Sequence, residues 1–162
     1  MENSITIKSA EEIKQDSIAF FSNPVKIEKV LYTGKTHTTG GRDGGHSQSD
    51  DRHLDIALTT PGKKGDGTNP EQLFAAGWSA CFLSAIRLAA GKMKVTIPTE
   101  IAVDTEVDLS TNSDGAFLQA RLNVSLPGLD REVGKALIET AHQTCPYSKA
   151  SHGNINVTIT LV

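Results

Sequence analysis

Apolar and polar residues alternate along two neighbouring segments in the second half of the chain. Apolar side chains occupy every second position in residues 99–109, and residues 117–126 repeat the pattern after the turn sequence NSDG. Because successive side chains of a β-strand point to opposite faces, the two segments predict an antiparallel hairpin with one face toward solvent. Shorter segments of strand-like composition predict further strands at residues 25–33, 35–39, 53–60 and 154–162.

Residues 69–91 predict a helix that is apolar on almost every side. Asn69 is a favourable N-cap, Pro70 suits the first helical position, and Gly91 is a suitable stop. A helix without a wide polar face is typical of the centre of a protein, so we expect this helix to be buried. Its strongly polar exceptions after residue 73 are Ser79, Ser84 and Arg87.

The remaining patterns complete an α+β fold with antiparallel sheets packed around a buried central helix. Residues 130–144 predict an amphipathic second helix, and glycine-rich segments predict loops at residues 40–51 and 61–68. We expect a single domain over residues 25–162. Before it, we expect residues 1–24 to form an N-terminal arm or to contain a short helix at residues 10–21.

Composition and charge limit the classes of protein to which this chain can belong. The 162 residues are 38% apolar and 22% charged, which is ordinary for one compact domain. The net charge of −3 and the lack of a basic stripe argue against a nucleic-acid partner. Uninterrupted apolar runs fall short of the roughly 18 residues that a membrane span needs. The acidic N-terminal segment fits neither a signal peptide nor a transit peptide, so the expected location is cytoplasmic.

The two cysteines are the strongest candidates for chemistry. Cys81 and Cys145 are 64 positions apart and show neither a secreted disulfide framework nor a CxxC metal spacing. An apolar helix interior raises the pKa of a thiol, so Cys81 is inert unless another segment brings a cation to it. Cys145 precedes Pro146 at a predicted helix end, which suits a resolving cysteine that moves to form a disulfide. The alternative is a pair of buried, unreactive thiols.

Three motifs resemble one protein family. NPEQLFAAGWSACF around Cys81, CPYSKASHGNI around Cys145 and LYTGKTHTTGGRDG at residues 31–44 are similar to the organic hydroperoxide resistance (Ohr) branch of the Ohr/OsmC family. The motifs occur in the family's order from about Leu31 to the C-terminus. The chain departs from the family in its segment before Val25, in Trp78 where tyrosine is frequent, and in SHGNI where TRGNI is usual.

The resemblance implies a thiol peroxidase that reduces alkyl and fatty-acid hydroperoxides. By matching positions, Cys81 is the peroxidatic cysteine, Cys145 the resolving cysteine, Arg42 the partner of the thiolate, and Glu71 the carboxylate that orients Arg42. The family further implies an intertwined homodimer without a bound cofactor or metal. Its reductant is an external dithiol, typically the lipoyl group of a lipoylated protein.

Helix geometry adds a prediction about the dimer. Glu71 and Cys81 are ten positions apart, which corresponds to about 15 Å along one helix axis. Two copies of the helix packed antiparallel would bring Glu71 of one subunit near Cys81 of the other. We therefore expect Arg42 and Glu71 to serve the partner subunit's Cys81.

Other interpretations of these residues stay open at this point. An apolar pocket lined by four residues of the long helix would accept the alkyl chain of a peroxide, although each is also an ordinary core residue. The same pocket would serve a non-catalytic binder of apolar ligands. His142, Cys145 and His152 are candidate metal ligands, and GGRDGG at residues 40–45 is a candidate phosphate nest. The four pocket candidates are Leu73, Phe74, Trp78 and Phe82.

Overall fold

The computed structural model describes residues 25–162, so the predicted arm or short helix within residues 1–24 lies outside the described part. The chain divides into two units, Met1–Lys35 and Thr36–Val162. Residues 25–35 of the first unit contain no helix or strand, and their side chains are exposed. The strand predicted at residues 25–33 is therefore not formed in the single chain. An extended segment becomes a strand only when a neighbour completes its backbone hydrogen bonds.

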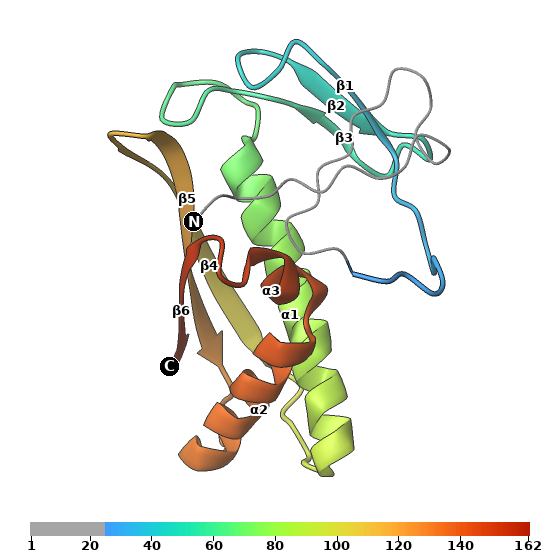
Figure 1. Cartoon of the computed structure of the whole chain (residues 1–162), viewed down its shortest axis with the longest axis vertical. Coiled ribbons are helices and arrows are strands. Elements are labelled where there is room, and N and C mark those ends of the chain that lie inside the picture. The colour runs from blue at the N-terminus through green and yellow to red at the C-terminus, as the bar shows by residue number, and fades with distance from the viewer. Residues whose placement is uncertain (1–24) are drawn as a thin grey trace. The chain divides into compact units, whose positions relative to one another are not determined.

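The predicted hairpin is confirmed and forms most of a three-stranded sheet (Figure 1). Strand β4 (Ala102–Asn112) pairs antiparallel with β5 (Gly115–Ser125), and β6 (Asn156–Leu161) pairs parallel with β5. The outer face carries charge, as the alternation predicted. There Nη1 of Arg121 lies 2.6 Å from Oδ2 of Asp108, and the hydrogen bonds of this arginine lower the pKa of Asp108 to about 2.

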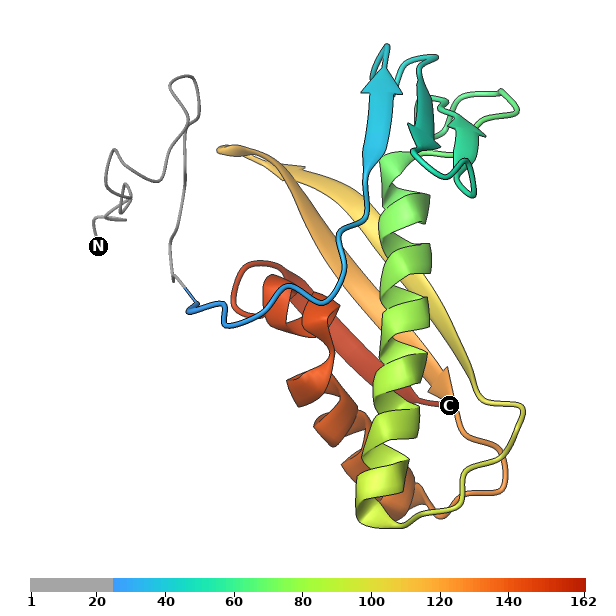
Figure 2. The ribbon, with the colours of Figure 1, turned by 90° about the vertical axis from the view of Figure 1, so that its right-hand side faces the viewer.

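Helix α1 (Pro70–Met93) begins where the sequence predicted, but it continues past Gly91, the predicted stop. The side chain of Asn69 accepts a hydrogen bond of 2.8 Å from the N–H of Gln72, which satisfies one of the free donors of the first turn. The helix ends at Lys94, whose backbone takes the left-handed conformation with φ of 54°. Figure 2 shows α1 lying against the sheet, with α2 (Arg131–Thr144) beside it.

The face of α1 that turns away from the sheet is not covered in the single chain. Ala76, Ala80, Ser84 and Leu88 follow one another at intervals of four residues, and all are exposed. Residues four apart share one side of a helix, so these residues form a continuous exposed strip of mainly small side chains. The prediction that this helix is buried on every side is therefore confirmed for the face toward the sheet and wrong for the exposed strip.

By length and composition α1 is also the one helix in the described residues that could cross a membrane. From the sequence we expected no membrane span, because Ser79, Ser84 and Arg87 interrupt the apolar residues of this segment. A core helix passes the same test, and one face of α1 supplies much of the core of residues 36–162.

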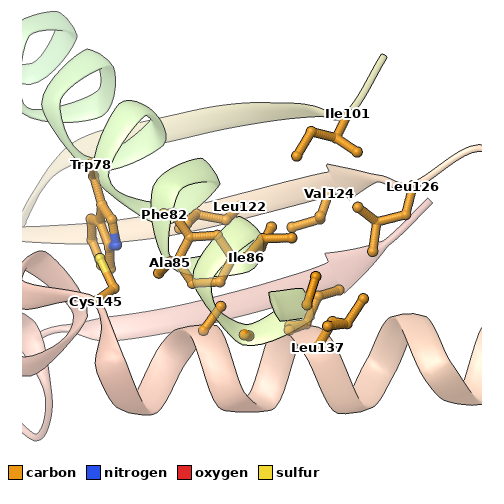
Figure 3. Close-up of a cluster of buried hydrophobic side chains, with 14 of the residues drawn as sticks. Trp78, Phe82, Ala85, Ile86, Ile101, Leu122, Val124, Leu126, Leu137 and Cys145 are labelled. Atoms are coloured by element: carbon orange, nitrogen blue, oxygen red, sulfur yellow. The ribbon is translucent and has the colours of Figure 1, made fainter. Parts of the chain in front are cut away.

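The core lies between the sheet, α1 and α2 (Figure 3). Leu122 on β5 and Leu137 on α2 are fully buried against the side chains of α1. Burying one such side chain stabilises the fold by about 1.5–3 kcal/mol. Helix α2 begins after Asp130, whose carboxylate accepts hydrogen bonds from two N–H groups of the first turn. The fully buried residues of α1 are Trp78, Phe82 and Ile86.

A second, smaller sheet consists of β1 (Thr36–Thr39), β2 (His46–Ser49) and β3 (Asp55–Ala57), in that order. The prediction of a loop throughout residues 40–51 is wrong for β2, which pairs antiparallel with both neighbours. Strand β2 consists of histidine, serine and glutamine, so its sequence lacks the alternation of apolar and polar residues that predicts a strand. The loop between β1 and β2 remains, and it carries Arg42.

Helix α3 (Pro146–Ser151) is a short helix that the sequence did not predict. Pro146 does end α2, as expected, but it also occupies the first position of α3, where its missing N–H costs nothing. Cys145 is therefore the residue at which α2 ends and α3 begins.

Candidate active site

The structure brings the two cysteines together. The Sγ atoms of Cys81 and Cys145 lie 3.4 Å apart, and both residues are free thiols. Cys81 projects from the middle of α1 and is partly exposed, whereas Cys145 is fully buried. An S–S bond is about 2.05 Å long, so the sulfurs need to approach by little more than 1 Å to form a disulfide.

The surroundings of Cys81 in the single chain do not favour its thiolate. Burial is the main cause that raises the pKa of Cys81, and the hydrogen bond and charge of Cys145 raise it further. A backbone hydrogen bond from Tyr147 acts in the opposite direction and lowers this pKa. No basic side chain of residues 25–162 is among these causes. The expectation that α1 alone leaves Cys81 unreactive therefore agrees with the structure.

Arg42 and Glu71 also lie together, at the start of α1. An Nη1 atom of Arg42 is 3.8 Å from Oε1 of Glu71, and the side chains are 43% and 10% exposed, respectively. The other carboxylate oxygen of Glu71 is buried and has no hydrogen-bond partner. A buried carboxylate oxygen without a donor is costly, so this ion pair is incomplete in the single chain.

The four candidate residues thus form two clusters. Cys81 and Cys145 meet at the middle of α1, while Arg42 and Glu71 meet at its first turn. The ten positions between Glu71 and Cys81 amount to about 15 Å of helix rise. A role for Arg42 at the thiol pair of a second subunit remains a prediction.

A cavity of about 330 Å³ adjoins the arginine–carboxylate pair and is lined by Arg42, Glu71 and Phe74. Trp78 and Phe82 are fully buried core residues, and Leu73 is half-buried. Of the four predicted pocket residues, Phe74 is therefore the one that lines this cavity. The opposite wall, which the hairpin supplies, was not predicted from the sequence. The hairpin residues that line the cavity are Leu109, Ala116, Phe117 and Leu118.

Two large apolar residues near a polar turn, Leu109 and Phe117, were the signal that the sequence offered. They are 45% and 47% exposed, close to the end of a hairpin whose turn is otherwise polar. Large apolar side chains at a solvated turn weaken folding unless something covers them or they bind a ligand. Their position across the cavity from Phe74 gives this end of the site an apolar wall.

The segment after Cys145 is held against α1 by aromatic contacts. The indole N–H of Trp78 donates a hydrogen bond of 3.2 Å to Oγ of Ser148, which is fully buried. The ring of Tyr147 packs edge-on to that of Phe74, with centroids 6.0 Å apart. These contacts position the backbone N–H of Tyr147 at Cys81.

Gly77 makes room for Tyr147. A Cβ atom at residue 77 would lie 2.6 Å from the hydroxyl of Tyr147, closer than such atoms approach. We expect Gly77→Ala to displace the half-exposed tyrosine ring and to loosen residues 145–148, which slows disulfide formation between Cys81 and Cys145 severalfold. The measurement is the rate of disulfide formation after peroxide addition, with Gly91→Ala as control because residue 91 has open space. Equal rates in both variants would contradict this role of Gly77.

The candidate metal site is not assembled. The rings of His142 and His152 have centroids 6.2 Å apart, and burial followed by the charge of His152 lowers the pKa of His142. Cys145 directs its sulfur to Cys81. Within residues 25–162 there is no group of three or more His, Cys, Asp or Glu residues that could hold a metal ion.

Two free thiols in contact, one on the core helix α1 and one at the end of α2, define a dithiol protein of the α+β class. The OsmC-like protein family matches residues 61–160. With this match and the relatives described next, the chain belongs to the OsmC/Ohr family, in its organic hydroperoxide resistance branch. The family resemblance read from the three sequence motifs is confirmed.

Related proteins span nearly the same length. The chain is 46% identical over 138 residues to the organic hydroperoxide resistance protein of Xanthomonas axonopodis pv. citri, which covers 83% of this chain and 96% of that protein. The crystal structure of OhrB from Bacillus subtilis is 39% identical, with a TM-score of 0.72 over 82% of this chain and 100% of that one. An organic hydroperoxide resistance protein from Legionella pneumophila is 40% identical, with a TM-score of 0.76 over 82% of this chain and 98% of that one.

Proposed function

We propose that this protein is a cysteine-based peroxidase that reduces organic hydroperoxides to alcohols. The observation that carries the proposal is the 3.4 Å contact between two free thiols, of which Cys81 is partly exposed and Cys145 is buried. A partly exposed thiol can meet a substrate, while the buried thiol next to it can trap the oxidised product. Family membership and the names of the relatives support the same chemistry.

The cycle needs two steps within the protein. The Cys81 thiolate attacks the distal oxygen of ROOH, the O–O bond breaks, and the leaving alkoxide takes up a proton to give ROH and a sulfenic acid on Cys81. Cys145 then attacks the sulfenic sulfur, so the S–S bond forms and water leaves. The separation of the two sulfurs allows this second step without rearrangement of α1.

The cation that Cys81 lacks is Arg42 of a second subunit in an intertwined homodimer. The exposed strip of α1 supports this assembly, because Ala76, Ala80 and Ser84 allow another helix to approach closely. Antiparallel packing on that strip brings the first turn of one helix toward the middle of the other. There the guanidinium favours the Cys81 thiolate and stabilises the departing alkoxide. Glu71 orients it.

The substrate class follows from the wall opposite Arg42. Phe74, Leu109 and Phe117 give the cavity an apolar lining beside a single cationic group. An alkyl or acyl hydroperoxide would place its chain on that lining and its peroxide group at Arg42. Hydrogen peroxide gains nothing from the apolar lining, so we expect organic peroxides to react faster.

Regeneration requires an external dithiol, because the disulfide holds two electrons fewer than the thiols. Cys81 is the sulfur that a donor can reach, since Cys145 is fully buried. A lipoyl group on a lipoylated protein is the proposed donor. Its slender dithiol chain fits an apolar cavity better than the surface of a folded reductase does.

The test is turnover by the full-length protein. Consumption of cumene hydroperoxide and of hydrogen peroxide is followed with either dihydrolipoamide or thioredoxin as electron donor. We expect sustained consumption with cumene hydroperoxide and dihydrolipoamide, and slower reaction in the other combinations. If neither peroxide is consumed with either donor, the peroxidase proposal fails, and a non-catalytic binder of apolar ligands in the same cavity becomes the better account.

A further inference from the structure

We propose that Asp43 is a positioning residue, which holds the Arg42 loop against the start of α1 through a hydrogen bond to Thr60. The Oγ1 hydroxyl of Thr60 donates to Oδ1 of Asp43 over 2.6 Å. The inference rests on the peroxidase function proposed above, because it concerns how Arg42 is kept available. Asp43 makes no contact with either thiol and acts through its neighbour in the chain.

The loop that carries Arg42 is closely packed at its base and has open space around the glycines of its tip. At the base, the N–H of Gly45 donates to the carbonyl of Gly41, and the carbonyl of Gly45 accepts from the N–H of Leu58. A Cβ atom at residue 45 would collide with backbone carbonyls, so this end is closely packed. At the tip, Gly41 and Gly44 have φ of 65° and 86° and open space around them. Backbone packing alone therefore does not hold the tip in place, and side-chain contacts are needed to do so.

Two side chains at the tip of the loop contact residues at either end of the connection from β3 to α1. Arg42 contacts Glu71 at the beginning of α1, and Asp43 contacts Thr60 just after β3. The arginine contact is 3.8 Å long and its side chain is 43% exposed, so water weakens it. The contact of Asp43 with Thr60 is also exposed, but at 2.6 Å it is a hydrogen bond, whereas the arginine contact is too long to be one.

Thr60 is itself a firm point of attachment. Its neighbour Thr59 donates its N–H to the carbonyl of Thr68 over 2.8 Å, and the carbonyl of Thr60 accepts from Lys63 over 3.0 Å. A loop tied to Thr60 is thus tied to the connection that leads into α1. This restricts Arg42 to positions near Glu71.

The unpartnered oxygen of Glu71 shows why the position of Arg42 matters. Oε2 of Glu71 is buried and accepts no hydrogen bond, while Oε1 has the guanidinium at 3.8 Å. A small inward movement of the guanidinium would supply donors to both oxygens. If the tip loses its attachment, Arg42 spends less time near Glu71 and is less often available to a thiolate.

The test uses substitutions at Thr60, which leave the loop sequence unchanged. Thr60→Val removes the donor at nearly equal size, and Thr60→Ser keeps a hydroxyl as the matched control. We expect Thr60→Val to lower the rate constant for oxidation of Cys81 by cumene hydroperoxide about fivefold, and Thr60→Ser to change it less than twofold. Asp43→Ala and Asp43→Asn form a second pair, because asparagine keeps an acceptor oxygen. Thermal unfolding of each variant checks that the fold is intact.

A second readout does not depend on peroxide chemistry. Trypsin cleaves after Arg42 when the tip leaves its attached position, so Thr60→Val should be cleaved there about fivefold faster than the wild type and Thr60→Ser. Equal cleavage rates in these three proteins would overturn the inference. Faster cleavage with an unchanged peroxide rate constant would overturn the positioning role. If the wild type does not react with peroxide, the proposed function fails, and the cleavage rates alone decide whether Asp43 holds the loop.

Discussion

Replacing Cys81 with serine should reduce peroxide consumption to the rate of the buffer. Serine matches cysteine in shape, but its hydroxyl does not ionise near neutral pH and cannot attack the O–O bond here without a general base. Within residues 25–162 of the single chain, the side-chain partner of the Cys81 sulfur is another thiol rather than a base. The measurement is single-turnover decay of cumene hydroperoxide with the reduced protein in excess.

Cys145→Ser is the matched control for this prediction. Its Cys81 still attacks the first equivalent of peroxide, so the first turnover should proceed at close to the wild-type rate. Because Cys145 is then missing, the sulfenic acid persists and can be trapped with dimedone. Residual activity of Cys81→Ser above the buffer rate would contradict the assignment of Cys81 as the attacking thiol.

Replacing Arg42 with glutamine should lower the rate constant for peroxide reduction by about 10²-fold. Burial raises the pKa of Cys81 in the single chain, so a cation is needed to favour the thiolate and to stabilise the leaving alkoxide. Arg42→Lys should recover part of the rate, since a lysine keeps the charge but loses the planar pair of donors. Alkylation of Cys81 by iodoacetamide against pH should show a higher thiol pKa in Arg42→Gln.

Arg131→Gln is the control for charge alone, because Arg131 lies at the exposed start of α2. It should leave both the rate constant and the alkylation profile unchanged. Equal losses in Arg42→Gln and Arg131→Gln would show that net charge, rather than a placed guanidinium, determines the rate.

Mixed dimers decide which subunit Arg42 serves. If the chain forms the proposed homodimer, co-expression of Cys81→Ser and Arg42→Gln chains gives heterodimers that pair an intact Arg42 on one subunit with an intact Cys81 on the other. If Arg42 acts across the interface, every heterodimer contains one complete site and activity returns. Inactive heterodimers would indicate that Arg42 acts on Cys81 of its own chain. That result would contradict the separation of the arginine–carboxylate pair from the thiol pair along α1.

Much of the fold could be predicted because its elements carry strong local signals. The hairpin was visible in the strict alternation of residues 99–109 and 117–126, and α1 in its cap and its apolar length. Strand β2 escaped prediction because it is held by hydrogen bonds to β1 and β3 rather than by apolar side chains. Helix α3 escaped because Pro146 is equally suited to ending one helix and beginning the next.

The contact between the two cysteines was predictable, but the arrangement of the other candidate residues around them was less so. The proximity of Cys81 and Cys145 came from the family motifs, since no local pattern relates residues 64 positions apart. The apolar character of α1 suggested burial on all sides, although a strip of small residues is exposed in the single chain. An apolar side chain that packs on a second subunit looks the same in sequence as one that packs in its own core.

The most direct test of the proposed dithiol cycle is the mass of the intact protein after one equivalent of cumene hydroperoxide. We expect the chain to lose two hydrogens, peptide mapping to find Cys81 joined to Cys145 within one chain, and dihydrolipoamide to reverse the change. A chain that gains oxygen without forming this disulfide, or that the peroxide leaves unchanged, would show that the two thiols do not act together in this way.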